Sequence, residues 1–153
     1  MDTKIQKPLN DRVSWKTLHS QIRIVKSSLT FKELSATKSE NLFVLNAHRQ
    51  IVFITRSCLD LFDIEDPATA YGCRPGEMMQ CVNAQANGCG VSENCKLCGA
   101  RTAVLTCLEG EATSRSFQLL QDGSEQAMNF TITAEAITLE GQLFLMISLI
   151  LSS

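Results

Sequence analysis

The sequence predicts an α+β fold: a five-stranded antiparallel sheet with helices on one face, preceded by an N-terminal helical extension. Three observations support this prediction. Apolar residues recur at helical spacing before residue 36, and short runs rich in Val, Ile and Phe begin near residue 41. Further along, the turn dipeptides Asp122-Gly123 and Glu140-Gly141 separate three strand-like runs. An antiparallel sheet commonly buries one face beneath helices.

Residues 1–36 are predicted to form an N-terminal amphipathic helix ahead of a core at 37–153. A stripe of apolar residues, three or four positions apart, follows one face of this helix from about residue 10 to residue 30. Its members are Trp15, Leu18, Ile22, Val25 and Leu29. Such a stripe either covers the chain's own core or pairs with the same helix of a second copy, and the two uses are compatible. We therefore expect a homodimer formed through this helix.

The core elements are predicted in chain order. Two apolar runs around a polar turn at 46–50 indicate a strand hairpin, after which Ser57 is a plausible cap for a short helix. The segment 66–99 holds two prolines and five cysteines, so no long element is expected there. A helix is predicted over 100–109, ended by Gly110, and strands over 114–121, 126–139 and 142–153.

Charge and hydropathy exclude several classes of protein. The formal net charge is −2 and no cluster of Lys and Arg is evident, which argues against nucleic-acid binding. The N-terminal residues lack the apolar core of a signal peptide, and no apolar run approaches the ~18 residues of a membrane span. We therefore expect a cytoplasmic protein with no nucleic-acid or membrane partner. In that compartment seven cysteines indicate metal or redox chemistry rather than stable disulfides.

Four cysteines lie within 18 residues, in the spacing C-x7-C-x5-C-x2-C: Cys81, Cys89, Cys95 and Cys98. A Cys-x-x-Cys pair brings two thiolates to one centre, and two thiolates from the preceding loop can complete a four-sulfur site. Glycines at 88, 90 and 99 permit the sharp bends that such a loop needs. The pattern therefore predicts a metal site at these four cysteines.

Spacing alone does not decide what the four thiolates bind. Zinc sites more often pair two Cys-x-x-Cys knuckles, and this sequence has one, which favours an iron–sulfur cluster. Structural zinc is the alternative. A third possibility is that the thiols hold no metal and are either inert or form a redox-switchable disulfide.

Three stretches resemble the PAS family of sensor domains. LFVLNAHRQIVFIT followed by SCLDLF is similar to the opening of that fold, and YGCRPGEMMQCVNA resembles the Gly-Arg-Pro-Gly-Glu stretch of certain bacterial PAS domains. GCGVSENCKLCGARTAVL is similar to a cysteine-rich variant found in bacterial sensors. The resemblance covers residues 37–153.

The resemblance implies a sheet in the strand order 2-1-5-4-3, a ligand or cofactor cavity between sheet and helices, and dimerisation through a helix before the core. It also implies a sensory function, with a signal passed to an output protein such as a kinase or regulator. No output domain is recognised in the chain, so we expect either a stand-alone sensor or a fragment of a longer one. The first hypothesis is a redox or oxygen sensor with an iron–sulfur cluster or metal. The alternatives are a zinc-braced interaction module and a PAS domain that binds a small apolar ligand.

The remaining cysteines and histidines are expected to have ordinary roles. Cys58 and Cys107 are interpreted as small core residues, whereas Cys73 is a possible substitute ligand. A flavin adduct is improbable, because the residues around Cys73 lack the Asn-Cys-Arg-Phe-Leu motif of flavin-binding PAS domains. Haem is also improbable, because His19 and His48 fall in the N-terminal helix and the hairpin turn, where solvated side chains are expected.

No catalytic motif is present, so the chain is not expected to be an enzyme. The acidic run from Asp60 to Asp66 is interpreted as a solvated helix end. Three phenylalanines of the last strands are expected in the core or lining the cavity: Phe117, Phe130 and Phe144. Four methionines could make that cavity adaptable to an apolar ligand: Met78, Met79, Met128 and Met146.

Overall fold

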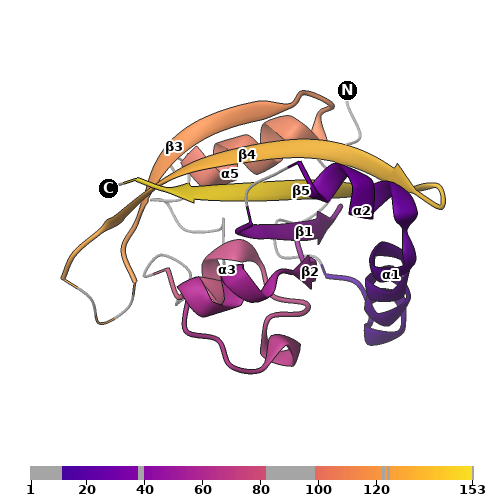
Figure 1. Cartoon of the computed structure of the whole chain (residues 1–153), viewed down its shortest axis with the longest axis horizontal. Coiled ribbons are helices and arrows are strands. Elements are labelled where there is room, and N and C mark those ends of the chain that lie inside the picture. Colours follow the sequence, from indigo (N-terminus) through magenta and orange to yellow (C-terminus); the bar gives the residue numbers. More distant parts are fainter. Residues whose placement is uncertain (1–11, 38–39, 82–98, 122, 124, 153) are drawn as a thin grey trace.

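The computed structural model describes residues 12–37, 40–81, 99–121, 123 and 125–152. Figure 1 shows the arrangement of the elements, which follow in the order α1 (Trp15–Ser27), α2 (Leu29–Ser35), β1 (Leu42–Asn46), β2 (Ile51–Ile54), α3 (Arg56–Leu61), η2 (Pro67–Thr69), α4 (Pro75–Met78), α5 (Gly99–Leu108), β3 (Thr113–Leu119), β4 (Met128–Leu139) and β5 (Gln142–Leu151). Within these ranges, every helix is too short or too polar to cross a bilayer.

The five strands form one antiparallel sheet in the order β2-β1-β5-β4-β3, which confirms the predicted fold and strand order. β5 is the central strand and pairs with β1 on one side and β4 on the other. The β4–β5 turn has φ values of 48° at Glu140 and 77° at Gly141, the two positive values that a two-residue type I′ turn requires. The prediction of a turn at Glu140-Gly141 is therefore confirmed.

Apolar side chains form two clusters on opposite faces of the sheet. Phe43 and Leu45 belong to the inner cluster, with residues in or next to α3, α4 and α5 and residues of the strands β3, β4 and β5. They include Cys58, Leu59, Phe62, Met78, Met79, Val104, Cys107, Phe117, Phe130, Ile132, Leu145 and Ile147. Leu42 and Val44 alternate with them along β1 and belong to the outer cluster, with Leu18, Ile24, Val25, Phe31, Val52, Leu139, Phe144 and Met146.

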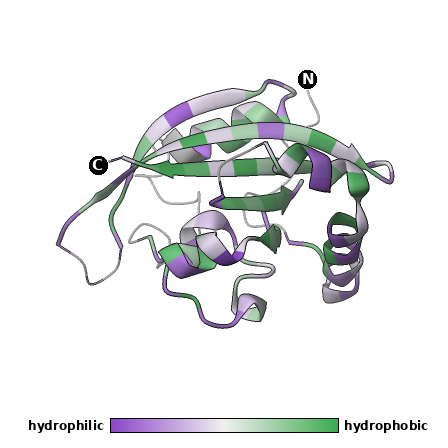
Figure 2. Cartoon of the chain, viewed as in Figure 1, coloured by the Kyte–Doolittle hydropathy of each residue, from purple (hydrophilic) through white to green (hydrophobic). Residues whose placement is uncertain are grey.

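Helices were predicted on one face of the sheet, and α3, α4 and α5 lie on that inner face. The structure has a second helical layer, because α1 and α2 cover part of the outer face. All five residues of β1 are buried, since both faces of this strand are covered. Figure 2 shows the consequence in the sequence: β1 and β5 are hydrophobic along most of their length, whereas β4 alternates. A strand buried on both faces has a continuous apolar run.

The single helix predicted over about 10–30 is two helices. Its predicted start at residues 10 and 11 lies outside the described residues. α1 begins after Ser14, whose side chain accepts from Thr17 N, and ends at Ser27. Ser28 has extended dihedrals and caps α2 by accepting from Phe31 N. The stripe is consequently broken: Leu18 and Val25 are buried in the outer cluster, while Leu29 is 74% exposed.

The prediction that Ser57 caps the next helix is wrong by two residues. α3 begins at Arg56, and the Thr55 side chain accepts from Cys58 N. Ser57 instead donates from Oγ to Asn41 Oδ1 at 2.7 Å, which connects α3 to the residue before β1. The sequence offers two neighbouring hydroxyls, and packing of α3 on β1 decides which one faces the free amides.

Candidate functional site

Of the four cysteines predicted to bind a metal, only Cys81 lies in the described part of the chain. Cys89, Cys95 and Cys98 lie outside it, so their convergence stays a prediction. Among the described residues, no group of three or more His, Cys, Asp and Glu side chains is arranged to hold a metal ion. In the part of the chain that the structure describes, the candidate site consists of Cys81 and the elements that border the segment 82–98.

Cys81 is held between α4 and Gln121, two residues after the end of β3. Its N–H donates to Gly76 O at 2.8 Å, and it forms an isolated antiparallel bridge with Gln121. The Gln121 side chain donates to Met79 O at 3.1 Å. Gln80, with a φ of 59°, makes the turn between α4 and Cys81. Backbone and side-chain bonds thus fix Cys81 against two elements at once.

The other end of the cysteine segment adjoins the same strand. α5 begins at Gly99 and packs on β3 and β4. The connection from Leu108 to Thr113 is short, so α5 runs antiparallel to β3 and its first turn lies toward the β3 end near Gln121. The two described residues that flank this segment therefore both lie near β3: Cys81 is bridged to Gln121, and Gly99 begins a helix that packs on β3.

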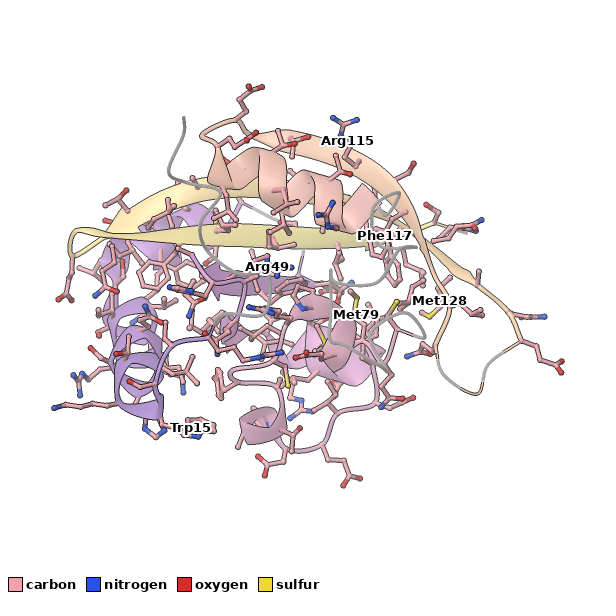
Figure 3. The ribbon with its side chains drawn as sticks, turned by 180° about the vertical axis from the view of Figure 1, so that it is seen from behind. Trp15, Arg49, Met79, Arg115, Phe117 and Met128 are labelled. Atoms are coloured by element: carbon pink, nitrogen blue, oxygen red, sulfur yellow. The ribbon has the colours of Figure 1, made fainter. Side chains whose placement is uncertain are left out.

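The inner surface next to Cys81 is apolar and rich in sulfur. Cys81 and Met128 pack at the margin of the inner cluster, which contains Met78, Met79 and Phe117; Figure 3 shows Met79, Phe117 and Met128 on the same side of the molecule. The Phe117 and Phe130 rings stack with centroids 5.4 Å apart. Three of the four methionines predicted to line an adaptable cavity lie here.

The prediction for Met146 is wrong. Met146 belongs to the outer cluster, as does Phe144, because both residues point to the face covered by α1 and α2. Phe117 and Phe130 lie on the inner face and Phe144 is core on the other. Alternation along β5 places successive residues on opposite faces, so a methionine count alone does not show which side chains share a cavity.

A buried network of side-chain amides joins α1 to the β1–β2 turn. Asn46 is fully buried; its Nδ2 donates to Gln21 Oε1 at 2.9 Å, and its Oδ1 accepts from the N–H groups of His48 and Gln50 at 2.9 Å each. Gln50 Oε1 accepts from Val13 N at 2.9 Å. This network was not predicted from the sequence. The position of Gln21 could have indicated it, because Gln21 is three positions after Leu18 and four before Val25, on the buried face of the helix.

A second set of contacts joins the start of α1 to α4. Arg12 forms an ion pair with Glu77 and donates to Gly72 O at 3.2 Å. Gly72 has a φ of 86°, and a Cβ at this position would lie 3.0 Å from Leu18 Cδ2, so glycine permits the close approach of α1. Glu77 also accepts from Arg74 N at 3.0 Å. α4, which leads directly to Cys81, is thereby linked to the N-terminal helix.

Neither a family model nor a curated protein matches the chain, but solved structures do. One is the PAS domain of an HTR-like protein from Haloarcula marismortui, with a TM-score of 0.52 and 17% identity, over 87% of this chain and 98% of that one. The chain has the PAS fold. A d2 variant of RsLOV is also similar, with a TM-score of 0.52 and 12% identity, over 91% of this chain and 68% of that one. At these identities the likeness shows the fold alone.

In this PAS domain, three of the described cysteines have protonated thiols at neutral pH. Burial raises the pKa of Cys58 to about 12. Burial, and secondly Glu135, raises the pKa of Cys107. Burial and Glu77 raise the pKa of Cys73, although Arg12 opposes them. Cys58 and Cys107 are core residues, as predicted. The Cys73 thiol donates to Thr69 O at 3.3 Å, so it is engaged locally.

The histidines and the acidic run lie where the sequence analysis expected, with one difference. His19 is exposed on α1, but His48 is half-buried because its carbonyl accepts from Arg74 Nε at 3.2 Å. The acidic residues are exposed at the end of α3: Asp60, Asp63, Glu65 and Asp66. Asp60 pairs with Arg56 at 3.0 Å, one helical turn before it. This run is a solvated helix end.

The raised pKa of Cys58 predicts a pH dependence of stability. Cys58 retains its proton in the folded state up to about pH 12 but loses it near its ordinary value of 9.0 when unfolded. The stabilisation is complete below pH 9 and is lost as pH rises toward 12, at up to about 1.4 kcal/mol per pH unit. Urea unfolding of wild type and Cys58→Ala at several pH values measures it. If the free energy of unfolding fell equally steeply with pH in both proteins between pH 9 and 12, the raised pKa of Cys58 would be contradicted.

Proposed function

We propose that this PAS domain senses redox state or oxygen through an iron–sulfur cluster or another metal centre held by Cys81, Cys89, Cys95 and Cys98. Support comes from the position of Cys81, which is bonded to α4 and bridged to Gln121 beside β3. Four thiols form a donor set suited to such a centre. When bound, the centre would supply a state that changes with oxidant or electron supply.

The contacts around Cys81 supply a route by which the signal leaves the site. Gly76 O holds the Cys81 amide, and the adjacent Glu77 carboxylate pairs with Arg12 at the start of α1. A rearrangement of the cysteine segment therefore alters the support of α1 through one short helix, α4. We propose that α1 passes this change to a separate output protein such as a kinase or regulator, with homodimerisation through the N-terminal helix as part of the assembly.

The methionines beside Cys81 favour a second candidate function, the binding of a small apolar ligand. Met78 and Met79 are buried in the inner cluster and Met128 packs against it, and the same cluster contains the stacked rings of Phe117 and Phe130. Unbranched thioether side chains adapt to ligands of different shape. In this alternative the cysteines are incidental. In both candidates the domain is a non-catalytic, cytoplasmic sensor.

The first experiment is anaerobic purification followed by absorption spectroscopy and analysis of iron, acid-labile sulfide and zinc. Brown protein with iron and sulfide supports the proposal, and colourless protein with stoichiometric zinc identifies the bound metal as a structural brace. Metal-free protein contradicts a metal centre and favours the apolar ligand.

Single replacements test the ligand set. Cys81→Ser, Cys95→Ser and Cys98→Ser should each lose the bound metal while the sheet stays folded, because Cys81 packs only at the margin of the inner cluster and the buried residues described for both clusters are unchanged in all three variants. Cys107→Ala is the matched control, since Cys107 is a buried core thiol, 1% exposed, that should leave the metal content unchanged. Full metal content in all three serine variants would show that the ligand assignment is wrong.

A further inference from the structure

The outward face of α1 forms a shallow hollow that the PAS core does not use. Its volume is about 510 Å³, and it is lined by Trp15, Lys16, His19, Ser20 and Arg23. Leu18, Gln21 and Val25 point the other way, into the outer cluster or the amide network. The helix therefore has a side that packs on the core and a second side on which Lys16, His19 and Arg23 are exposed.

Trp15 is the most unusual residue of this hollow. It is the only tryptophan of the chain and its side chain is 67% exposed. The His19 ring lies edge-on to the indole, with centroids 5.7 Å apart, which restrains the indole on the surface. A large, exposed and restrained aromatic side chain is the kind of anchor that dominates protein–protein interfaces.

The hollow is also cationic. Residues 12–32 contain five basic residues and no Asp or Glu, although the chain as a whole has a net charge of −2. Lys26 lies over the Tyr71 ring, whereas Lys16 and Arg23 form no ion pair within the described residues. Lys16 and Arg23 are seven positions apart, so they do not form a basic cluster in the sequence. Two turns of helix bring both side chains to the hollow.

The spacing of the residues that line the hollow suits packing against another helix. Trp15, His19 and Arg23 form one row at i, i+4 and i+8, and Lys16 and Ser20 form the neighbouring row. Such rows are the ridges between which a second helix inserts its own side chains. The row from Trp15 to Arg23 spans about 12 Å of helix axis, two turns of a partner.

We propose that the outward face of α1 is a docking surface for an amphipathic, acidic helix of a partner protein. An apolar ridge of the partner would cover Trp15, and its carboxylates would lie beside Lys16 and Arg23. A second copy of this chain fits this face of α1 poorly, because symmetric pairing would place like charges together. The proposed homodimer would instead use α2, where Leu29 is exposed. A nucleic acid would be repelled by the acidic residues that predominate in the rest of the chain.

The test uses a fluorescein-labelled amphipathic peptide of about 20 residues, with Leu on one face and Glu on the other, and its counterpart with Lys in place of Glu. Binding of the Glu peptide should raise the fluorescence anisotropy of its label, and the affinity should decrease as the salt concentration increases. Trp15→Ala and Arg23→Glu should each reduce its affinity at least about tenfold. Arg115→Glu makes the same charge change on exposed β3, at the opposite end of the molecule in Figure 3, and should leave the affinity within about twofold.

Several results would overturn the proposal. Equal affinity for the Glu and Lys peptides would show that the hollow does not select acidic helices. An equal loss of affinity in Arg115→Glu and Arg23→Glu would show that the Glu peptide does not bind specifically at the hollow. Tighter binding of a labelled oligothymidine that is lost in Arg23→Glu would assign the face to nucleic acid. A sedimenting dimer abolished by Trp15→Ala would assign it to a second copy. Cys95→Ser should bind the peptide normally, so failure of the proposed metal site is distinguishable from failure of this one.

Discussion

Replacing Phe130 with alanine is expected to reduce the free energy of unfolding by about 3–5 kcal/mol. Phe130 is 1% exposed and its ring lies 5.4 Å from that of Phe117 and 5.9 Å from that of Phe62. It therefore connects β3, β4 and the end of α3 across the inner cluster. Removing the ring leaves a cavity that β-sheet neighbours cannot fill without breaking their pairing. Urea unfolding followed by circular dichroism measures the loss.

Ile150→Ala is the matched control for Phe130→Ala. Ile150 is also in the sheet but is 56% exposed on β5, so its replacement should change stability by less than about 1 kcal/mol. Similar losses in the two variants would indicate that the inner cluster is not the part of the fold that packing stabilises most.

Replacing Asn46 with alanine is expected to cost about 2–4 kcal/mol, more than an ordinary hydrogen bond contributes. The Asn46 side chain satisfies the His48 and Gln50 amides and Gln21 Oε1, all at 2.9 Å. Alanine would leave these groups buried without partners, and α1 would lose its bond to the β1–β2 turn. Hydrogen exchange should therefore accelerate across 15–27 in addition to the change in global stability.

Asn129→Ala provides the control, since Asn129 is an exposed residue of β4 and its replacement should leave exchange in α1 unchanged. If Asn46→Ala accelerated exchange uniformly over the whole chain, α1 would unfold only with the sheet, and the route from α4 to α1 would not be an independent one.

Much of the fold was predictable because its signals are local. The β4–β5 turn follows from Glu140-Gly141, two residues that adopt positive φ, and the end of α5 follows from Gly110 with a φ of 100°. The same is true of the core thiols at 58 and 107, each of which is followed directly by a leucine in a helix with other apolar residues. For the candidate site, the spacing of the cysteines predicts the chemistry, and Cys81 is the one ligand whose surroundings the structure describes.

Other features depend on residues far apart in the chain. Ser14 and Ser28 are equally good helix caps by composition, and their use as caps of two separate helices depends on how α1 and α2 pack on the outer cluster. The amide network pairs Gln21 with Asn46 across 25 positions. The contact of Arg12 with Glu77 spans 65. No local pattern specifies such partners.

The sequence by itself determined the order of the strands, the turn between β4 and β5 and the alternation of side chains between the two sheet faces, because dihedral preferences and periodicity act over a few residues. The connection from Leu119 to Met128 is longer than the tight turn predicted at Asp122-Gly123. Only the tertiary structure decided that α1 uses Leu18 and Val25 for the chain's own core and presents Trp15, Lys16 and Arg23 outward. The physical reason is that burial depends on which surfaces meet, and an apolar stripe on a helix does not encode the surface that covers it.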